Sequence, residues 1–297
     1  MMELSDLRAL EDAVGVALRT RDARQLRLVG HGEITMALGW PTQEPQFVCK
    51  RLPPFDSVDA ASAYGAIVNR YINTLRRRGV HVVETEVEWF ERPDGRVIVY
   101  HVQPALAPET LGLDILRRST PRVDHPLLSS VVDTVIASTG GGVGVDAQIS
   151  NWSWMEGEPW QLDLSTPIMM NDAGQPALDM TPFLAVLPAV IRPVVRREMG
   201  KLIRRWLTTR DSLMDLAANL IKANLEDWMQ SVLDCINERI DEPITYQEAE
   251  RIFKSDRRMF PPLLVLGRAN RLWQEQVRRR PFEFLLPDST TYTEQAK

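Results

Sequence analysis

Apolar residues change their spacing along the N-terminal part of the chain. Across residues 3–19 they recur every three or four positions, which predicts an amphipathic helix with Leu4, Leu7, Leu10, Val14 and Leu18 on one side. Extended stretches separated by turns follow, in QLRLVGHGEITMALGWP and FVCKRLPPF, and we expect three short strands there.

A second helical pattern covers residues 57–78 and ends at Gly79. Beyond it, apolar and acidic residues alternate in VHVVETEVEWFE, a PDG turn follows, and RVIVYHVQPAL is interpreted as an apolar return strand, so two more strands are predicted. A helix inserted after the third of five strands is typical of a small α+β unit and not of an alternating parallel sheet.

The chain becomes mainly helical after Leu106. Residues 128–139 have helical spacing, a glycine-rich run at 140–144 interrupts it, and amphipathic segments dominate from residue 183 onward. Between them lies GVDAQISNWSWMEGEPWQLDLSTP, which we interpret as a hairpin. We therefore expect two lobes: an N-terminal sheet lobe with its leading helix at 1–105, and a C-terminal helical lobe at 106–297 that carries the hairpin.

Composition narrows the class of protein. The chain has 297 residues, 44% of them hydrophobic and 25% charged, as in an ordinary globular protein. Its net charge of −5 gives no general attraction to nucleic acid, so no nucleic-acid partner is expected. Two cysteines are too few for a disulfide framework or a zinc site. The acidic start is unlike a secretory signal, and the most apolar run, FLAVLPAVI, is too short to span a bilayer, so we expect a cytoplasmic protein without a membrane partner.

The hairpin carries a spaced set of polar residues. Asp146 is followed five residues later by Asn151, and Asp163 stands twelve residues beyond that. This spacing, behind an α+β lobe, resembles the catalytic loop and metal-binding aspartate of the protein-kinase-like superfamily, nearest its small-molecule (aminoglycoside- or choline-type) phosphotransferase branch. The resemblance implies a two-lobed α+β fold, with a small five-stranded antiparallel sheet lobe containing one helix and a larger, mainly α-helical lobe.

The resemblance also implies cofactors and roles. ATP and Mg²⁺ would be bound, with Asp163 and Asn151 as metal ligands, because magnesium prefers oxygen ligands. Asp146 would accept the proton of the attacking hydroxyl group. The implied activity is transfer of the γ-phosphoryl group of ATP to a hydroxyl of a small-molecule acceptor.

Upstream residues complete the implied nucleotide site. Lys50, on the third predicted strand, would neutralise phosphate oxygens. Gly30 and Gly32, in VGHGEIT, would let a strand turn approach the phosphates. Gln103 lies in VYHVQPAL, at the position of the hinge that would contact adenine.

Other interpretations of the same residues stay open. Asp146 and Asn151 are common turn residues, and Asp163 is of a type that caps helices. The helix at 57–78 has no acid at the place where the family pairs one with Lys50, and GVGV replaces the usual lead into Asp146. These departures favour an alternative, a catalytically inactive kinase-like protein that binds a nucleotide or a partner as a scaffold or regulator. A third alternative is that the lobes are unrelated to kinases.

A basic segment at 192–210 stands apart from this set. It holds seven basic residues against the single acid Glu198, namely Arg192, Arg196, Arg197, Lys201, Arg204, Arg205 and Arg210. Such a run is commonly a solvated helix face, and its functional interpretation is a surface for an acidic partner or substrate. The predicted buried side consists of Val194, Val195, Leu202, Ile203 and Trp206.

Overall fold

The computed structural model describes residues 2–31, 35–185, 187–277, 279 and 282–284, with the backbone alone for residues 31 and 256–264. Its first part is a five-stranded antiparallel sheet in the order β1-β2-β3-β6-β5. The strands are β1 (Arg27–His31), β2 (Met36–Trp40), β3 (Phe47–Arg51), β5 (Glu86–Glu91) and β6 (Val97–Pro104). The α+β class and the five antiparallel strands predicted from the sequence are confirmed.

Part of one predicted strand leaves this sheet. His81 and Val82 form the short strand β4 (His81–Val82), which pairs in parallel with β8 (Glu158–Gln161) in a second sheet of order β4-β8-β7. Only the later part of VHVVETEVEWFE, β5, pairs with β6. The second sheet therefore ties the sheet lobe to the hairpin of the helical lobe.

The two faces of the main sheet pack against different helices. Alternate residues of a strand point to opposite faces, and on β6 the buried Ile98 and Tyr100 belong to one apolar cluster with α1 (Leu4–Thr20), whereas Val97 and Val99 belong to another with α2 (Val58–Arg77). Helix α2 begins where the side chain of Ser57 accepts a hydrogen bond from the backbone N–H of Ala60, at 3.1 Å. The sheet is thus covered on both faces.

The larger part of the chain is helical. Its helices are α3 (Gly112–Arg118), α4 (Pro126–Ser138), α5 (Thr181–Leu184), α6 (Arg192–Arg205), α7 (Thr209–Lys222), α8 (Met229–Asn237) and α9 (Tyr246–Leu272). Asn224, with a φ of 55°, ends the helical run between α7 and α8 in the left-handed conformation that asparagine tolerates. A reciprocal pair of hydrogen bonds between Thr245 and Glu248 begins α9. No helix in the described part of the chain is long and apolar enough to cross a membrane.

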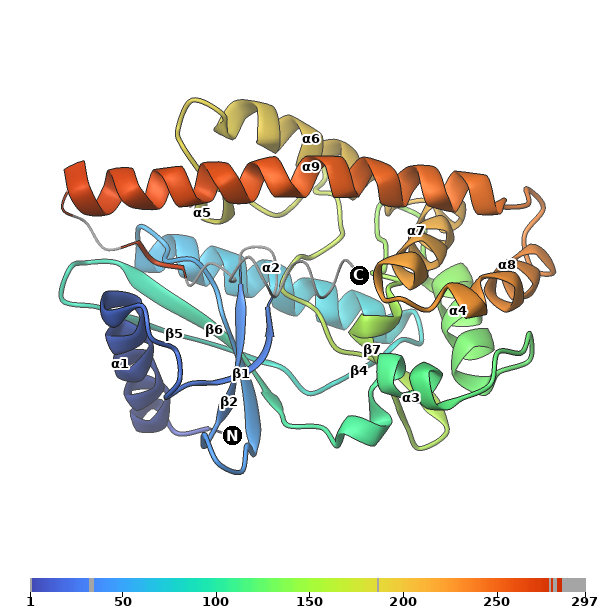
Figure 1. Ribbon diagram of the computed structural model, residues 1–297, viewed down its shortest axis with the longest axis horizontal. Coiled ribbons are helices and arrows are strands. Elements are labelled where there is room, and N and C mark those ends of the chain that lie inside the picture. Colours follow the sequence, from blue (N-terminus) through green and yellow to red (C-terminus); the bar gives the residue numbers. More distant parts are fainter. Residues whose placement is uncertain (1, 32–34, 186, 278, 280–281, 285–297) are drawn as a thin grey trace.

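Helix α9 returns the chain to the sheet. Figure 1 shows it extending across the width of the molecule, from beside α7 and α8 to a position above the sheet in that view. A π-helical turn, Trp273–Val277, follows, and its Glu275 pairs with Arg21 at the end of α1, at 2.5 Å. Phe282 and Phe284 are then buried in the cluster that α1 shares with the sheet. The C-terminal part of the chain therefore covers the face of the sheet that α2 does not.

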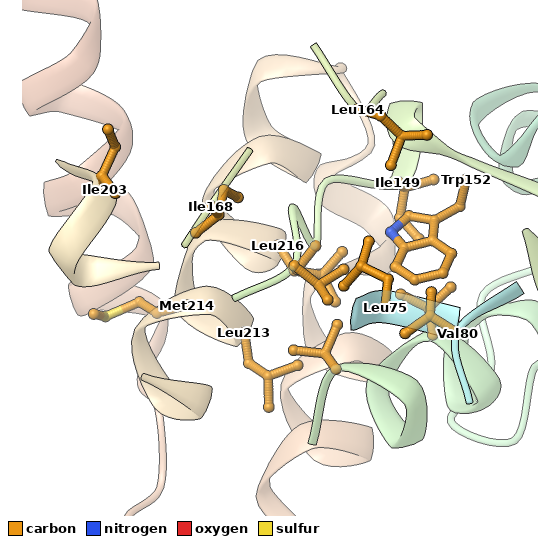
Figure 2. Close-up of a cluster of buried hydrophobic side chains, with 14 of the residues drawn as sticks. Leu75, Val80, Ile149, Trp152, Leu164, Ile168, Ile203, Leu213, Met214 and Leu216 are labelled. Atoms are coloured by element: carbon orange, nitrogen blue, oxygen red, sulfur yellow. The ribbon is translucent and has the colours of Figure 1, made fainter. Parts of the chain in front are cut away.

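The apolar cluster on the α2 face of the sheet continues under the hairpin. Figure 2 shows Leu75 of α2, Ile149 and Trp152 next to the hairpin, and Leu216 of α7 converging in it. Trp152 is fully buried there, as expected for a packing residue. This cluster fixes the hairpin between α2 of the sheet lobe and α7 of the helical lobe.

Candidate active site

The hairpin brings two of the predicted metal ligands together. Strands β7 (Trp152–Met155) and β8 are joined by Glu156 and Gly157, which have φ values of 57° and 81° and form a two-residue turn of the type that hairpins favour. At the open end of the hairpin, the carbonyl of Asn151 accepts a hydrogen bond from the N–H of Leu162 at 2.8 Å. Asn151 and Asp163 therefore lie at the same end of the hairpin.

The chain that leads into Asp146 is held by close packing. Three glycines in succession, at 140–142, have positive φ values of 129°, 55° and 79°. At Gly144, a Cβ atom would lie 2.0 Å from the carbonyl oxygen of Trp206, in the turn after α6. The hydroxyl of Tyr71 donates to the carbonyl of Gly144 at 2.9 Å. The lead is therefore fixed between α2 and the end of α6, and only glycine fits at position 144.

Lys50 and Asp163 form an ion pair. Lys50 Nζ lies 2.5 Å from Asp163 Oδ2, and both side chains are partly exposed, at 20% and 32%. Asp163 Oδ1 accepts hydrogen bonds from the N–H and the hydroxyl of Ser165, at 3.0 and 2.8 Å. Burial opposes the charged form of Asp163, but Lys50 and these hydrogen bonds lower its pKa to about 2. The carboxylate is therefore ionised across the physiological pH range.

Asp146 lies close to this pair and has the opposite electrostatic character. Burial and the negative charge of Asp215 raise the pKa of Asp146 to about 8, with a smaller contribution from Asp163. A hydrogen bond from the N–H of Gln148, at 3.1 Å, and the charge of Lys50 act in the other direction. Two carboxyl groups in one site thus have pKa values well apart, which is typical of sites in which one carboxyl group exchanges a proton.

Gln161 connects the two aspartates and was not predicted from the sequence. Its side chain is fully buried, and its Nε2 lies 3.4 Å from the carbonyl of Asp146 and 3.5 Å from that of Asp163. Trp152 Nε1 donates to the carbonyl of Asp146 as well, at 3.1 Å. The sequence signal was the position of Gln161 at the end of the strand that leads into Asp163.

Two of the predicted nucleotide-binding residues, Gly30 and Lys50, lie in the same row across the main sheet. The strand register aligns Gly30, Ala37, Lys50 and His101 in one row across β1, β2, β3 and β6. Neighbouring strands are about 4.8 Å apart, so Gly30 lies about 10 Å from Lys50 along this row. Gly32 lies outside the described residues.

The side chain of Gln103 is engaged within the protein. Its Nε2 lies 2.8 Å from Thr85 Oγ1 and 2.7 Å from the carbonyl of Leu162, the residue before Asp163. This amide therefore links β6 to the end of the hairpin.

The only acid in α2 is Asp59, in its first turn, as the sequence indicated. On the side of the sheet that carries Lys50, α2 instead places Tyr64, whose hydroxyl lies 2.7 Å from His101 Nε2 and 2.9 Å from the carbonyl of Ser165. Burial, with the positive charge of Lys50, lowers the pKa of His101 to about 3, so this histidine is neutral. Sequence reasoning missed Tyr64, Ser165 and His101, because nothing local in their pattern distinguishes them from packing residues.

The basic segment is not a single helix. Arg210 belongs to α7 and pairs with Glu248 at 2.9 Å, and Arg205 pairs with the buried Asp215 at 3.2 Å. The exposed basic side chains are those of α6, namely Arg196, Arg197, Lys201 and Arg204. Among the residues predicted to be buried, Ile203 is confirmed and Val194 is wrong, since Val194 is 64% exposed. The helix turns once every 3.6 residues, which places Val194 away from Ile203.

Comparison with known proteins identifies a family. A model for the family of unknown function DUF6206 matches residues 9–270. The chain belongs to this family. No curated protein matches the chain.

Two solved structures are similar to this DUF6206 member over most of their length. One is described as WaaP in complex with acyl carrier protein, with 15% identity, a TM-score of 0.40, and coverage of 85% of this chain and 90% of that chain. The other is the amicoumacin kinase hAmiN in complex with AMP-PNP, Ca²⁺ and Ami, with 12% identity, a TM-score of 0.31, and coverage of 88% and 96%. In the DUF6206 chain a helix follows the third strand of the antiparallel sheet and a helical lobe carries the hairpin, which is the arrangement expected from the sequence.

The open end of the hairpin carries two side chains with oxygen donors of the kind that magnesium prefers. Asp163 supplies an ionised carboxylate and Asn151 an amide oxygen, both partly exposed at the open end of the hairpin. Magnesium is commonly held by one or two protein oxygen ligands, with water and phosphate oxygens completing the shell. Among the described residues no group of three or more His, Cys, Asp or Glu forms a metal site. A metal at this hairpin would therefore need further oxygen ligands, such as water and the oxygens of a bound phosphate.

Proposed function

We propose that the protein is an ATP-dependent phosphotransferase that transfers the γ-phosphoryl group to a hydroxyl of a small molecule. The observation that supports it is the ion pair of Lys50 and Asp163 at 2.5 Å, with Asp146 near enough that both charges act on its pKa. In phosphoryl transfer, catalysis consists mainly of positioning and charge stabilisation, which such a set supplies.

Each residue has a role in this proposal. Asp163 and Asn151 hold the magnesium ion, which neutralises charge on the phosphate oxygens when bound. Lys50 contacts the phosphates from β3, and the backbone near Gly30 approaches them from the other end of the same row of the sheet. The backbone of β6 near Gln103 contacts the adenine.

Asp146 accepts the proton of the attacking hydroxyl group. A general base acts best when its pKa is near the working pH, and the pKa of about 8 meets this condition. Since only the ionised carboxylate accepts a proton, kcat/KM should rise with pH and level off above about pH 8.

The acceptor is proposed to be anionic. The end of α6 contacts the lead into Asp146 through Trp206 and Gly144, and the exposed basic side chains of α6 lie on the same helix. A positively charged surface next to a site raises the local concentration of anions. An acceptor with a phosphate or carboxylate group therefore fits better than a cationic one.

Metal-dependent nucleotide binding tests the proposal. ATP at a hundred times its Kd should stabilise the protein by about 2.7 kcal/mol, a shift of about 5 °C in Tm, in the presence of Mg²⁺ and much less in its absence. Asp163→Asn should remove the magnesium-dependent part of the shift. Asp146→Asn should keep it but abolish phosphoryl transfer. Asp133→Asn, a change in the exposed carboxylate that pairs with Arg239 on the surface, is the control and should leave both unchanged. A wild-type protein with no magnesium-dependent shift would contradict the proposal.

A second candidate is a nucleotide-binding regulator without turnover. Two observations favour it: the pKa of Asp146 is raised to about 8, which favours the protonated carboxyl group at neutral pH, and the one acid of α2, Asp59, lies in its first turn. This candidate predicts a normal magnesium-dependent shift and no phosphoryl transfer to any acceptor, or to water, even at pH 9. Transfer that increases between pH 7 and pH 9 would instead support the enzyme.

A further inference from the structure

Tyr64 occupies the side of α2 that faces Lys50 and Asp163. Its side chain is 3% exposed, and its hydroxyl lies between His101 Nε2, at 2.7 Å, and the carbonyl of Ser165, at 2.9 Å. His101 is the cross-strand partner of Lys50, so their side chains share one face of the sheet. Tyr64 thus contacts a neighbour of each member of the ion pair.

The proton positions in this contact follow from its chemistry. A tyrosine hydroxyl has a single proton, and the Ser165 carbonyl is only an acceptor, so Tyr64 donates to Ser165. His101 Nε2 must then donate to the Tyr64 oxygen. The low pKa of His101 agrees with this, because the imidazole is neutral with one N–H. The hydrogen bonds therefore run in one direction, from β6 through α2 to the segment after Asp163.

The same direction continues to the carboxylate. Ser165, whose carbonyl Tyr64 binds, donates both its N–H and its hydroxyl to Asp163 Oδ1. Asp163 Oδ2 meets Lys50 Nζ. Displacement of Ser165 would thus rotate the carboxylate away from both Lys50 and a metal ion. In metal sites, groups that orient the ligands affect affinity nearly as much as the ligands themselves.

We propose that Tyr64 is a positioning residue, which couples α2 to the metal-binding carboxylate of Asp163 in place of an acid paired with Lys50. This inference rests on the proposed function, because it names the device that holds the proposed metal ligand. It assigns to α2 a link to Asp163 through a hydroxyl group, where a direct charge pair between α2 and Lys50 is lacking. A shift of α2 would therefore move Ser165, and with it the carboxylate of Asp163.

Tyr64→Phe tests the hydroxyl separately from the ring. The ring of Tyr64 packs against Phe55 and Phe183, with centroids 5.3 and 5.9 Å away, and phenylalanine keeps these contacts. Tyr71→Phe is the matched control, since Tyr71 lies two turns along the same helix, is 1% exposed, and donates one hydrogen bond to a backbone carbonyl, that of Gly144. Both variants lose one buried hydroxyl, and Tyr64→Phe should lose more stability because it also leaves the buried N–H of His101 without its acceptor.

The readout is the ratio of ATP Kd values measured without and with Mg²⁺, by calorimetry. Wild type and Tyr71→Phe should show the same ratio. In Tyr64→Phe the ratio should fall about tenfold, as for other changes behind a metal ligand, while the Kd without metal stays as in wild type. Ser165→Ala should lower the ratio too, because Asp163 Oδ1 then loses one of its two hydrogen bonds from Ser165.

The outcomes separate this inference from the proposed function. A wild-type ratio of one would overturn the proposed function and this inference with it. A wild-type ratio well above one, with Tyr64→Phe equal to Tyr71→Phe, would overturn only the role of Tyr64.

Discussion

Replacing Glu11 with glutamine should strongly destabilise the sheet lobe. Glu11 of α1 accepts hydrogen bonds from Arg51 Nε at 2.7 Å, from Arg51 Nη2 at 2.8 Å and from the hydroxyl of Tyr100 at 2.7 Å. The side chains of Arg51 and Glu11 are only 1% and 7% exposed. Burial disfavours the charge of Arg51, but its hydrogen bonds and charge interaction with Glu11 hold its pKa above the ordinary value.

The size of the effect follows from this burial. Removing one partner of a buried ion pair leaves an uncompensated charge and costs about 3 to 5 kcal/mol. Glu283 also contacts Arg51, at 3.2 Å, and retains part of the compensation, so we expect the lower end of this range. For a chain of this size, about 3 kcal/mol corresponds to a loss of about 6 °C in Tm.

Urea unfolding, followed by circular dichroism, measures this change. The control is Asp133→Asn, whose carboxylate pairs with Arg239 on the surface and is 61% exposed, and which should change the free energy of unfolding by less than about 0.5 kcal/mol. Glu283→Gln should cost more in the Glu11→Gln background than in wild type, because Arg51 then loses both carboxylates. A Glu11→Gln protein as stable as the Asp133→Asn control would refute the reasoning.

Two further predictions concern the lead into the hairpin and the aspartate that follows it. Gly144→Ala should destabilise the protein by about 3 kcal/mol or more, because a Cβ would meet the carbonyl of Trp206; Gly200→Ala, in open space on α6, should instead stabilise it by up to about 1 kcal/mol, and equal effects in thermal unfolding would contradict this. Asp146→Asn should raise Tm relative to wild type increasingly from pH 5 to about pH 8 and by a constant amount above that, because in this range the unfolded carboxyl group has lost its proton while the folded one, with a pKa raised from 3.8 to about 8, still holds it, so wild type loses stability as pH rises; a difference independent of pH would count against the raised pKa.

The parts of the site that the sequence predicted are those set by local geometry. Asn151 and Asp163 flank a hairpin. Its strand lengths and its turn, which contains Gly157, are determined by residues that are consecutive in the sequence. Lys50 was found from its place on the third strand of a recognisable order of strands. The strands and most helices followed from periodicity for the same reason.

What the sequence did not predict depends on contacts between distant parts of the chain. Tyr64 and Ser165 are 101 residues apart, and either one has the local pattern of an ordinary packing residue. Arg51 and Glu283 are 232 residues apart, so no window of sequence contains their interaction. The basic segment at 192–210 was interpreted as one surface, but Arg205 and Arg210 form ion pairs with Asp215 and Glu248 and so do not contribute free positive charge to it.

The two basic residues at the end of β3 show how the fold separates a reactive charge from a structural one. Lys50 and Arg51 are consecutive, so their side chains lie on opposite faces of the sheet. Lys50 meets Asp163 in a partly exposed pair, where a ligand can compete for either charge. Arg51 is enclosed by α1 and the segment that follows α9. Breaking its ion pairs with Glu11 and Glu283 would leave a buried charge without compensation. Because the C-terminal segment arrives from the helical lobe through α9, the rigid side of β3 also fixes the sheet against that lobe. Movement near the Lys50–Asp163 pair is therefore expected on the side of the sheet that packs against α2 and the hairpin, and not on the side covered by α1.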